Sequence, residues 1–205
     1  MLTGLVRPDS GEASLDGVRL RGDGTAVRRR VTYAPGELHL YGELTAAEQL
    51  DWLLRGRKRA ARRRGRELIG ELGLPLNDRV RTFSHGMKRQ LVFAAAMAPD
   101  VRIRILDEPT EGLDPTKRGL VLELLEEDAA RGTTVLLSSH HLGEVDRACG
   151  RLLFLNGGRL VADETAEAVA DRAGRLVRVS WPEGTDPALL AAACEEGPEQ
   201  LVRQE

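Results

Sequence analysis

The sequence predicts an α/β protein whose core is a parallel β-sheet. Apolar strands alternate with helical stretches after residue 101, and buried strands of this kind imply a parallel sheet covered on both faces. A long helical stretch from Thr45 to about Ala98 separates these strands from a shorter strand before it. The fold class expected is therefore α/β, with a helical subdomain at about 45–98 and a short antiparallel β portion.

The N-terminal part is expected to contain short elements. Residues 1–6 read as the last turns of a helix that Gly4 closes. Residues 12–20 read as two strands joined by an Asp-Gly turn, and residues 28–36 as a short strand that ends at a Pro-Gly break.

The elements expected after residue 44 follow the hydrophobic period and the positions of glycine and proline. Breaks in the helical stretch are expected at Gly56, at Gly65 and at residues 73–78. The elements expected beyond it are a strand at 101–106, a helix at about 116–131, a strand at 133–139, a short helix from Leu142, a hairpin at 151–163 with its turn at 156–158, a helix at about 164–173 and a strand from Arg175, with weaker signals from Pro182 onward.

Composition excludes several classes of protein. The formal net charge of the 205 residues is −2, so no overall field favours nucleic acid, and we expect no nucleic-acid partner. Cys149 and Cys194 are far apart and lack the spacing of a metal site. No signal peptide or membrane-spanning apolar run is seen, which predicts a reduced cytoplasmic setting and a membrane role only through a partner.

Polar residues follow two of the expected strands at their carboxyl ends. Asp107 and Glu108 follow one apolar strand, and Ser138, Ser139 and His140 follow the next. Ligands of parallel sheets bind at these ends. A carboxylate there suits Mg²⁺, and a second carboxylate can polarise an attacking water. The alternative is a capped strand end without catalytic function, which is the weaker explanation once the two groups are taken together.

A second candidate anion site lies upstream, where residues 83–87 lead into a helix. Ser84 is expected to cap that helix, and Gly86 lets the backbone approach a ligand closely. Helix N-termini bind anions because their amide groups lack intrahelical acceptors.

Four motifs in this order resemble the ATP-binding subunit of ABC transporters, a P-loop NTPase (ABC ATPase) fold. The stretch "FSHGMKRQ" is similar to the signature motif, "RIRILDEP" to Walker B, "GLDP" to the D-loop and "LLSSHH" to the switch-histidine loop. The resemblance covers roughly residues 1–170, which we take as the ATP-binding domain, and leaves 171–205 as a C-terminal extension. Residues 151–169 are similar to subunits of drug exporters whose permease is a separate chain.

The resemblance implies a role for each motif residue within one site. Asp107 would hold Mg²⁺ through water, Glu108 would be the general base of ATP hydrolysis, and His140 would contact the γ-phosphate. The cofactors implied are therefore ATP and Mg²⁺.

The resemblance also implies two kinds of partner. Ser84 and Gly86 would grip ATP that a second ATPase subunit holds, and Asp114 would communicate across that dimer. A transmembrane permease would be the other partner, which would place the chain peripherally on the inner face of the cell membrane and give it a function in export.

One motif of the family is missing. The phosphate loop GxxxxGK[ST] requires a Gly-Lys pair, and Lys58, Lys88 and Lys117 each follow another residue. We expect the chain to begin inside the helix that normally follows this loop, so the fold is expected to be N-terminally truncated. Whether the chain is itself an ATPase is left open; the alternative is a non-catalytic half that lends its signature motif to a complete partner.

Smaller departures affect the site. Gly36 stands where the family has the Q-loop glutamine, which weakens the metal site or moves the ligand to Glu37. His85 and Met87 replace two residues of the signature. Arg104 lies inside the Walker B strand, so either its side chain reaches an edge or the strand is less buried than usual.

Other features have simple explanations. The basic run at 55–67 is most simply a solvated helix face, with acidic permease loops or lipid headgroups as the alternative. A metal site at His140 and His141 is disfavoured, because no third ligand is near. His39 is expected on a surface loop, and Cys149 in the core.

Overall fold

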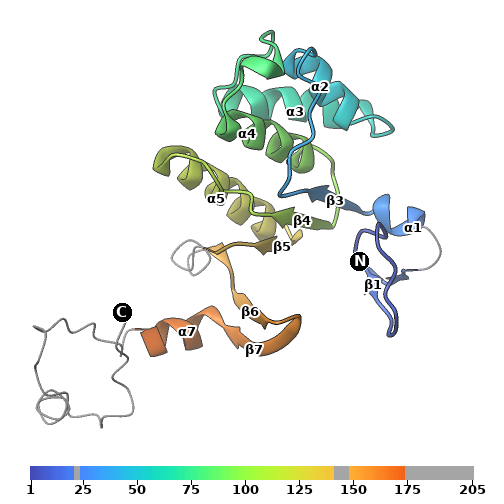
Figure 1. Cartoon of the computed structure of the whole chain (residues 1–205), viewed down its shortest axis with the longest axis vertical. Helices are drawn as coiled ribbons and strands as arrows, with labels where there is room; N and C mark the ends of the chain where they lie inside the picture. The colour runs from blue at the N-terminus through green and yellow to red at the C-terminus, as the bar shows by residue number, and fades with distance from the viewer. Residues whose placement is uncertain (21–23, 141–147, 174–205) are drawn as a thin grey trace, which may run out of the picture.

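The computed structural model describes residues 1–20, 24–140 and 148–173. Figure 1 shows three helices gathered on one side of a parallel sheet, with a C-terminal hairpin lying beyond the opposite edge. The elements are β1 (Ser14–Leu15), β2 (Val18–Arg19), α1 (Thr25–Arg28), β3 (Val31–Ala34), α2 (Ala46–Leu53), α3 (Arg59–Glu71), the 3₁₀ turn η1 (Val80–Thr82), α4 (His85–Met97), β4 (Ile103–Asp107), α5 (Pro115–Ala130), β5 (Thr134–Ser138), β6 (Arg151–Asn156), β7 (Arg159–Thr165) and α7 (Ala166–Ala173).

The expected parallel sheet is confirmed, and within the described residues its strand order is β3-β4-β5. Ile103 of β4 pairs with Val31 of β3 and with Thr134 of β5, and both pairings are parallel. Helices connect these strands, as parallel pairing requires. The register brings Asp107 opposite Ser138 at the carboxyl end of the sheet.

One face of the sheet is well covered and the other only at one end. Leu106 and Arg104 are buried on the face toward α4 and α5. On the other face Val31 is buried with the N-terminal hairpin, whereas Tyr33 and Leu136 are each 40% exposed. Within the described residues, the prediction that both faces are covered is therefore confirmed for the face toward α4 and α5. On the other face it is confirmed only at the end that the N-terminal hairpin covers.

The N-terminal expectations are confirmed in part. The hairpin β1-β2 turns at Asp16 and Gly17, both of which have positive φ, as a two-residue hairpin loop requires. The predicted helix at residues 1–6 is wrong, because these residues form a turn closed by a hydrogen bond from the Gly4 amide to the Met1 carbonyl. A stretch this short cannot offset the cost of helix nucleation.

The helical subdomain contains α2, α3 and α4, as predicted, and each boundary has a local cause. Thr45 and Glu48 form a capping box at the start of α2. The break at Gly56 is confirmed, and residues 73–78 separate α3 from the next turn. The predicted break at Gly65 is wrong, because Gly65 lies inside α3, where a Cβ would come within 3.0 Å of Leu50. Gly65 is there so that α2 and α3 can approach closely.

Arg57 covers the outer edge of the sheet. Its guanidinium donates to the carbonyl of Val31 at 2.8 Å and to the carbonyls of Arg28 and Arg29. Burial, with the nearby charge of Arg104, lowers the pKa of Arg57. Arg57 therefore ties the end of α1 and the first residue of β3 to the segment that follows α2.

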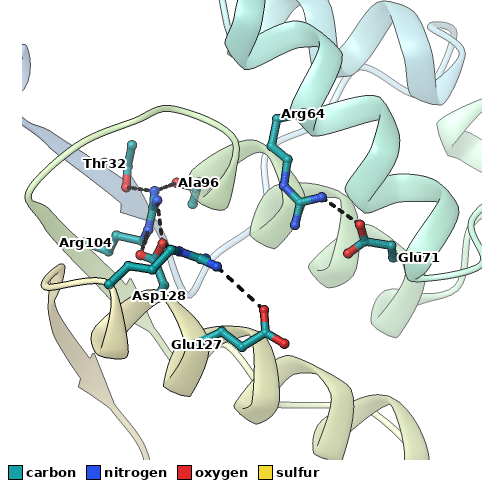
Figure 2. A network of polar contacts seen from close by, with 8 residues as sticks. Thr32, Arg64, Glu71, Ala96, Arg104, Glu127 and Asp128 are labelled. Carbon is teal, nitrogen blue, oxygen red and sulfur yellow. Dashed lines mark hydrogen bonds and ion pairs between the residues drawn. The ribbon is translucent and has the colours of Figure 1, made fainter.

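Arg104 overturns both sequence expectations, since it neither reaches an edge nor sits in an exposed strand. It is 3% exposed, and its Nε donates to Asp128 Oδ2 of α5 at 2.5 Å. The same guanidinium donates to the carbonyl of Ala96 at 2.6 Å and to Thr32 Oγ1 at 3.4 Å (Figure 2). The sequence analysis missed the partner, because Asp128 lies 24 residues away in a helix that had no assigned polar core position.

Arg104 and Asp128 form a buried ion pair in which each charge lies beside the opposite charge. Burial alone would raise the pKa of Asp128, but the hydrogen bonds and charge of Arg104, with a further bond from Arg131, hold that pKa below its ordinary value. Figure 2 shows Asp128 on α5 facing Arg104, with an exposed pair of α3, Arg64 and Glu71, well apart from them. The pair joins α5 to β4.

The C-terminal hairpin β6-β7 has its turn at Gly157 and Gly158, as predicted, and α7 follows it. The short helix expected from Leu142 and the strand expected from Arg175 lie outside the described residues, as do His141 and Cys194.

We predict that Asp128→Ala lowers the free energy of unfolding by about 3–5 kcal/mol, because Arg104 would remain buried without its counter-ion. Urea unfolding followed by circular dichroism measures this. Glu127→Ala is the matched control, since Glu127 is an exposed neighbour in the same helix, and should change stability by less than about 0.5 kcal/mol. Equal losses of unfolding free energy in the two variants would show that the buried pair stabilises the fold no more than an exposed pair does.

The lowered pKa of Asp128 predicts acid sensitivity. Its pKa when folded lies below the ordinary value of 3.8, so its contribution is complete above that value and is lost as the pH falls through the folded pKa. Unfolding free energies measured between about pH 5 and pH 2 should fall more steeply in the wild type than in Asp128→Asn. Parallel pH profiles would contradict this assignment.

Candidate functional site

The ends of β4 and β5 bring the predicted acids and serine together. The Ser138 hydroxyl donates to Asp107 Oδ1 at 2.6 Å, and the amide of Glu108 donates to Ser138 Oγ at 3.0 Å. The parallel register causes this contact, since Asp107 and Ser138 are directly paired. The sequence prediction that two neighbouring strands aim their polar ends at one site is confirmed.

Glu108 has a strained backbone and an oxygen without a hydrogen-bond partner. Its φ is +48°, a region that residues with a side chain seldom adopt. Its Oε1 lies 3.0 Å from His140 Nδ1, whereas its Oε2 is buried and accepts no hydrogen bond from any residue that the structure describes. An unsatisfied carboxylate oxygen in a strained turn is a feature of functional sites, because it can accept a hydrogen bond from water or ligand.

Gly36 contacts the carboxylate of Asp107 through its backbone. Its amide donates to Asp107 Oδ2 at 3.3 Å, and a Cβ at this position would lie 2.9 Å from the same oxygen. A side chain at position 36 would therefore require the Asp107 carboxylate to shift. Glu37, the other ligand considered, is exposed and lines the cavity described below.

The signature segment begins α4, and Ser84 caps it as predicted. The Ser84 side chain accepts a hydrogen bond from the Met87 amide at 3.1 Å. A Cβ at Gly86 would lie 2.8 Å from the carbonyl oxygen of Gly112, so the start of α4 lies directly against the turn that follows Glu108. The ring of His85 lies against Gly112. Gly86 thus has a packing role in addition to the anion-binding role that the sequence predicts.

Asp114 caps α5 at its N-terminus. Its Oδ1 accepts from the Lys117 amide at 3.0 Å, and Pro115 occupies the first position of the helix. Asp114 is exposed, so it is open to a second subunit. Lys117 in turn donates to the Leu72 carbonyl at 2.7 Å, which ties α5 to the end of α3.

The sequence analysis missed Arg89. It is 2% exposed in α4, and its guanidinium donates to Glu111 Oε2 at 2.6 Å. Weaker contacts reach the carbonyls of Pro35 and Asp107. A signal that could have indicated it is its place directly before the apolar run of α4 that begins at Leu91.

A cavity of about 640 Å³ opens beside this site. Asp107, Gly36 and Tyr33 line one side, and residues of α2 and α4 such as Leu53 and Val92 line the other. The cavity therefore joins the candidate site to the helical subdomain.

The remaining sequence predictions concern single features. His39 is exposed as expected, whereas Cys149 is only partly buried, and burial raises the pKa of its thiol. In the basic run, Arg64 and Arg66 form ion pairs with Glu71 and Asp51 on the protein surface, which agrees with a solvated helix face. Within the described residues no group of three or more His, Cys, Asp or Glu side chains is arranged to hold a metal.

Comparisons with known proteins identify the class. The family model described as "ABC transporter" matches residues 1–111. The chain therefore belongs to the ABC transporter family.

Several curated relatives are similar over most of the chain. It is 32% identical to the "Linearmycin resistance ATP-binding protein LnrL" of Bacillus subtilis, an alignment that covers 85% of this chain and 58% of the relative. It is 36% identical to the "Daunorubicin/doxorubicin resistance ATP-binding protein DrrA" of Streptomyces peucetius, with 86% and 55% covered. The "Nod factor export ATP-binding protein I" of Rhizobium etli is 34% identical, with 80% and 53% covered. The chain spans somewhat more than half the length of these relatives.

Solved structures agree on the fold. A "Structure of ATP binding subunit of ABC transporter" superposes with a TM-score of 0.74 at 34% identity and covers 84% of this chain and 74% of that one. The "Dimeric Structure of MJ0796, a Bacterial ABC Transporter Cassette" gives a TM-score of 0.71 at 24% identity, with 80% and 77% covered, and supports the fold alone. These neighbours confirm the expected ABC ATPase fold. None of the described helices is both long and apolar enough to cross a membrane.

We predict that Gly86→Ala destabilises the chain by about 1–3 kcal/mol, because the new methyl group would overlap the Gly112 carbonyl. Gly70→Ala is the matched control: Gly70 lies within α3 with nothing within 4 Å of an added Cβ, so this substitution should stabilise by about 0.5–1 kcal/mol. The free energies of unfolding of both variants in urea test this prediction. A stabilising Gly86→Ala would show that α4 does not depend on this close approach.

Proposed function

We propose that this chain is an ATP-binding subunit of an exporter and acts with a separate membrane permease. The observation that carries the proposal is the cluster of Asp107, Glu108, Ser138 and His140 at the carboxyl end of the sheet, in a fold shared with ABC ATPases. The name of one relative, "Nod factor export ATP-binding protein I", supports export as the direction of transport.

The residues of the cluster suit a hydrolytic reaction. Glu108 would accept a proton from the attacking water at its free Oε2. His140 contacts the other oxygen of Glu108 and would thereby orient the carboxylate, and it would also contact the terminal phosphate. The strained backbone of Glu108 is the cost of aiming this side chain away from the strand.

The donor set also fits Mg²⁺. Carboxylate and hydroxyl oxygens, here from Asp107 and Ser138, are the hard ligands that this cation prefers, and it keeps several waters besides. When bound, Mg²⁺ would neutralise charge on the phosphates of ATP. Asp107 would hold it through water, while Ser138 and the Gly36 amide keep the carboxylate in place.

A second subunit would complete each nucleotide site. Ser84 and Gly86 stand at the N-terminus of α4, where amide groups can bind a phosphate held by another chain. Asp114 lies exposed at the start of α5 and would contact the same partner.

The permease would dock beside the Gly36 turn. The cavity there borders α2, and Tyr41 and Trp52 form an edge-to-face pair with ring centroids 5.0 Å apart. Both rings are substantially exposed, at 54% and 40%, and exposed aromatic side chains are enriched in protein interfaces. Docking would place the chain in the cytoplasm, on the inner face of the membrane. In this arrangement residues 1–170 form the ATP-binding domain and 171–205 an extension.

A second function is favoured by one specific observation: no GxxxxGK[ST] motif occurs within these 205 residues. By themselves, these 205 residues would act as a non-catalytic half whose signature segment closes over ATP held by a complete subunit. Several charge-assisted hydrogen bonds, at roughly 1.5–3 kcal/mol each, would then be absent from its own site.

We predict that this chain alone hydrolyses ATP at the background rate, and that it associates with a complete ABC ATPase subunit only when ATP is present. Ser84→Ala should weaken that association by about 10- to 100-fold, because a hydrogen bond to a charged phosphate is lost. Sedimentation with a complete subunit, with and without ATP, measures this.

Thr45→Ala is the control, since it removes the cap of α2 in the same way but lies away from the signature segment. Association that ignores both ATP and Ser84 would sink the half-site function. ATP turnover by the chain alone that Glu108→Gln abolishes would instead support a complete ATPase and contradict the prediction.

A further inference from the structure

We propose that Arg89 is a positioning residue, which holds the Pro35–Gly36 turn against Asp107 and so sets the orientation of that carboxylate. The role of Asp107 in Mg²⁺ binding rests on the proposed function, whereas the positioning itself rests only on the contacts described here.

Arg89 is among the most buried charged residues that the structure describes, with 2% exposed. It lies in α4 within the stretch "FSHGMKRQ", five residues after Ser84, and the residues from Leu91 to Met97 that follow it are all buried. A buried guanidinium is costly unless its charge and its donors are met. Its contacts are therefore expected to carry a structural or functional constraint.

The guanidinium of Arg89 spans three segments. Its Nη2 donates to Glu111 at 2.6 Å, within the turn that follows Glu108. Its Nη1 lies 3.4 Å from the carbonyl oxygen of Pro35 and 3.5 Å from that of Asp107. The short contact with Glu111 anchors the guanidinium. The two longer contacts place it beside the carboxyl ends of both β3 and β4.

The Pro35–Gly36 turn meets the Asp107 side chain at this junction. The Gly36 amide donates to Oδ2, and the Ser138 hydroxyl donates to Oδ1. The carboxylate is thus held from two sides, and one of these sides is the turn whose carbonyl Arg89 holds. A Cβ at position 36 would lie 2.9 Å from Oδ2, so a residue with a side chain there would have to displace the Asp107 carboxylate.

Arg89 therefore links the signature helix to the candidate metal site within one chain. α4 carries Ser84 at its start and Arg89 one turn later, so a movement of α4 would pull on the Gly36 amide and on the Asp107 backbone. Lysine cannot replace this group, because a single ammonium cannot form the fork that reaches a carboxylate and two carbonyls at once.

The test is nuclear magnetic resonance on the complete 205-residue chain. The Gly36 amide proton reports its hydrogen bond to Asp107, and Asp107→Asn supplies the reference shift for the loss of the carboxylate. In Arg89→Met we expect the Gly36 signal to move more than halfway to that reference. We also expect its hydrogen exchange to become about tenfold faster relative to Leu68 of α3, a factor that corresponds to roughly 1.4 kcal/mol.

Two further variants separate positioning from general stability. Arg89→Lys keeps the charge beside Glu111 and should restore the unfolding midpoint more fully than it restores the Gly36 signal. Glu111→Gln leaves Arg89 in place but weakens its hydrogen bond to residue 111. The Gly36 signal should then shift less than in Arg89→Met, in the same direction. This variant tests the proposal even if Arg89→Met fails to fold. Arg66→Met is the control, because Arg66 of α3 makes an exposed ion pair with Asp51 of α2.

A Gly36 signal that stays at the wild-type position in Arg89→Met or in Glu111→Gln, while stability falls, would overturn the proposal and leave Arg89 a packing residue. The same shift in Arg66→Met would overturn it as well. None of these readouts depends on ATP, so an absence of ATP hydrolysis would count against the proposed function and not against the positioning role.

Discussion

The buried pair of Arg104 and Asp128 is the interaction on which the arrangement of this fold depends. A buried guanidinium inside a parallel strand is tolerated only if its charge is paired and its N–H groups are hydrogen-bonded, and three elements supply these partners. α5 supplies the carboxylate, the end of α4 supplies the Ala96 carbonyl and β3 supplies the Thr32 hydroxyl. The strand that carries Arg104 is also the one that ends in the candidate site. The contact that orders the core therefore also fixes the direction in which Asp107 and Glu108 leave the sheet.

A second set of polar contacts joins the helical subdomain to this core. Arg57 holds the carbonyls beside β3, Lys117 holds the carbonyl at the end of α3, and Arg89 holds the turns on both sides of Asp107. All three are cations that meet backbone carbonyls, which are groups that secondary structure leaves unpaired at its ends. Such contacts are directional, so they define how the subdomain sits on the sheet better than apolar packing alone would. The start of α4 and the turn after Glu108 are then close enough for Gly86 to lie against Gly112.

The candidate site combines residues that keep one another in place with a group that is left free. Ser138 and Gly36 satisfy both oxygens of Asp107, and His140 satisfies one oxygen of Glu108. The other oxygen of Glu108 is buried without a partner, in a residue whose backbone is strained. This asymmetry between the two adjacent acids suits a division of roles, with one carboxylate held still for a cation and the other available to water.

The sequence by itself determined the elements with strong periodicity and the polar residues at their ends. The strand before Asp107, the strand before Ser138, the cap at Ser84 and the hairpin turn at 157–158 all follow from local patterns, and local patterns depend on neighbours within a few residues.

Where tertiary contacts compete with a local pattern, prediction was wrong. Gly65 reads as a break, but it lies inside a helix because α2 packs against it. Arg104 reads as an exposed or edge residue, but its carboxylate partner lies in a helix 24 residues away. Only the tertiary structure showed that Arg89 reaches both Pro35 and Glu111 and that the Gly36 amide donates to the Asp107 carboxylate. The physical reason is the same in each case: burial of a charge or a close backbone approach is decided by segments distant in sequence, and no period or cap in the local chain encodes it.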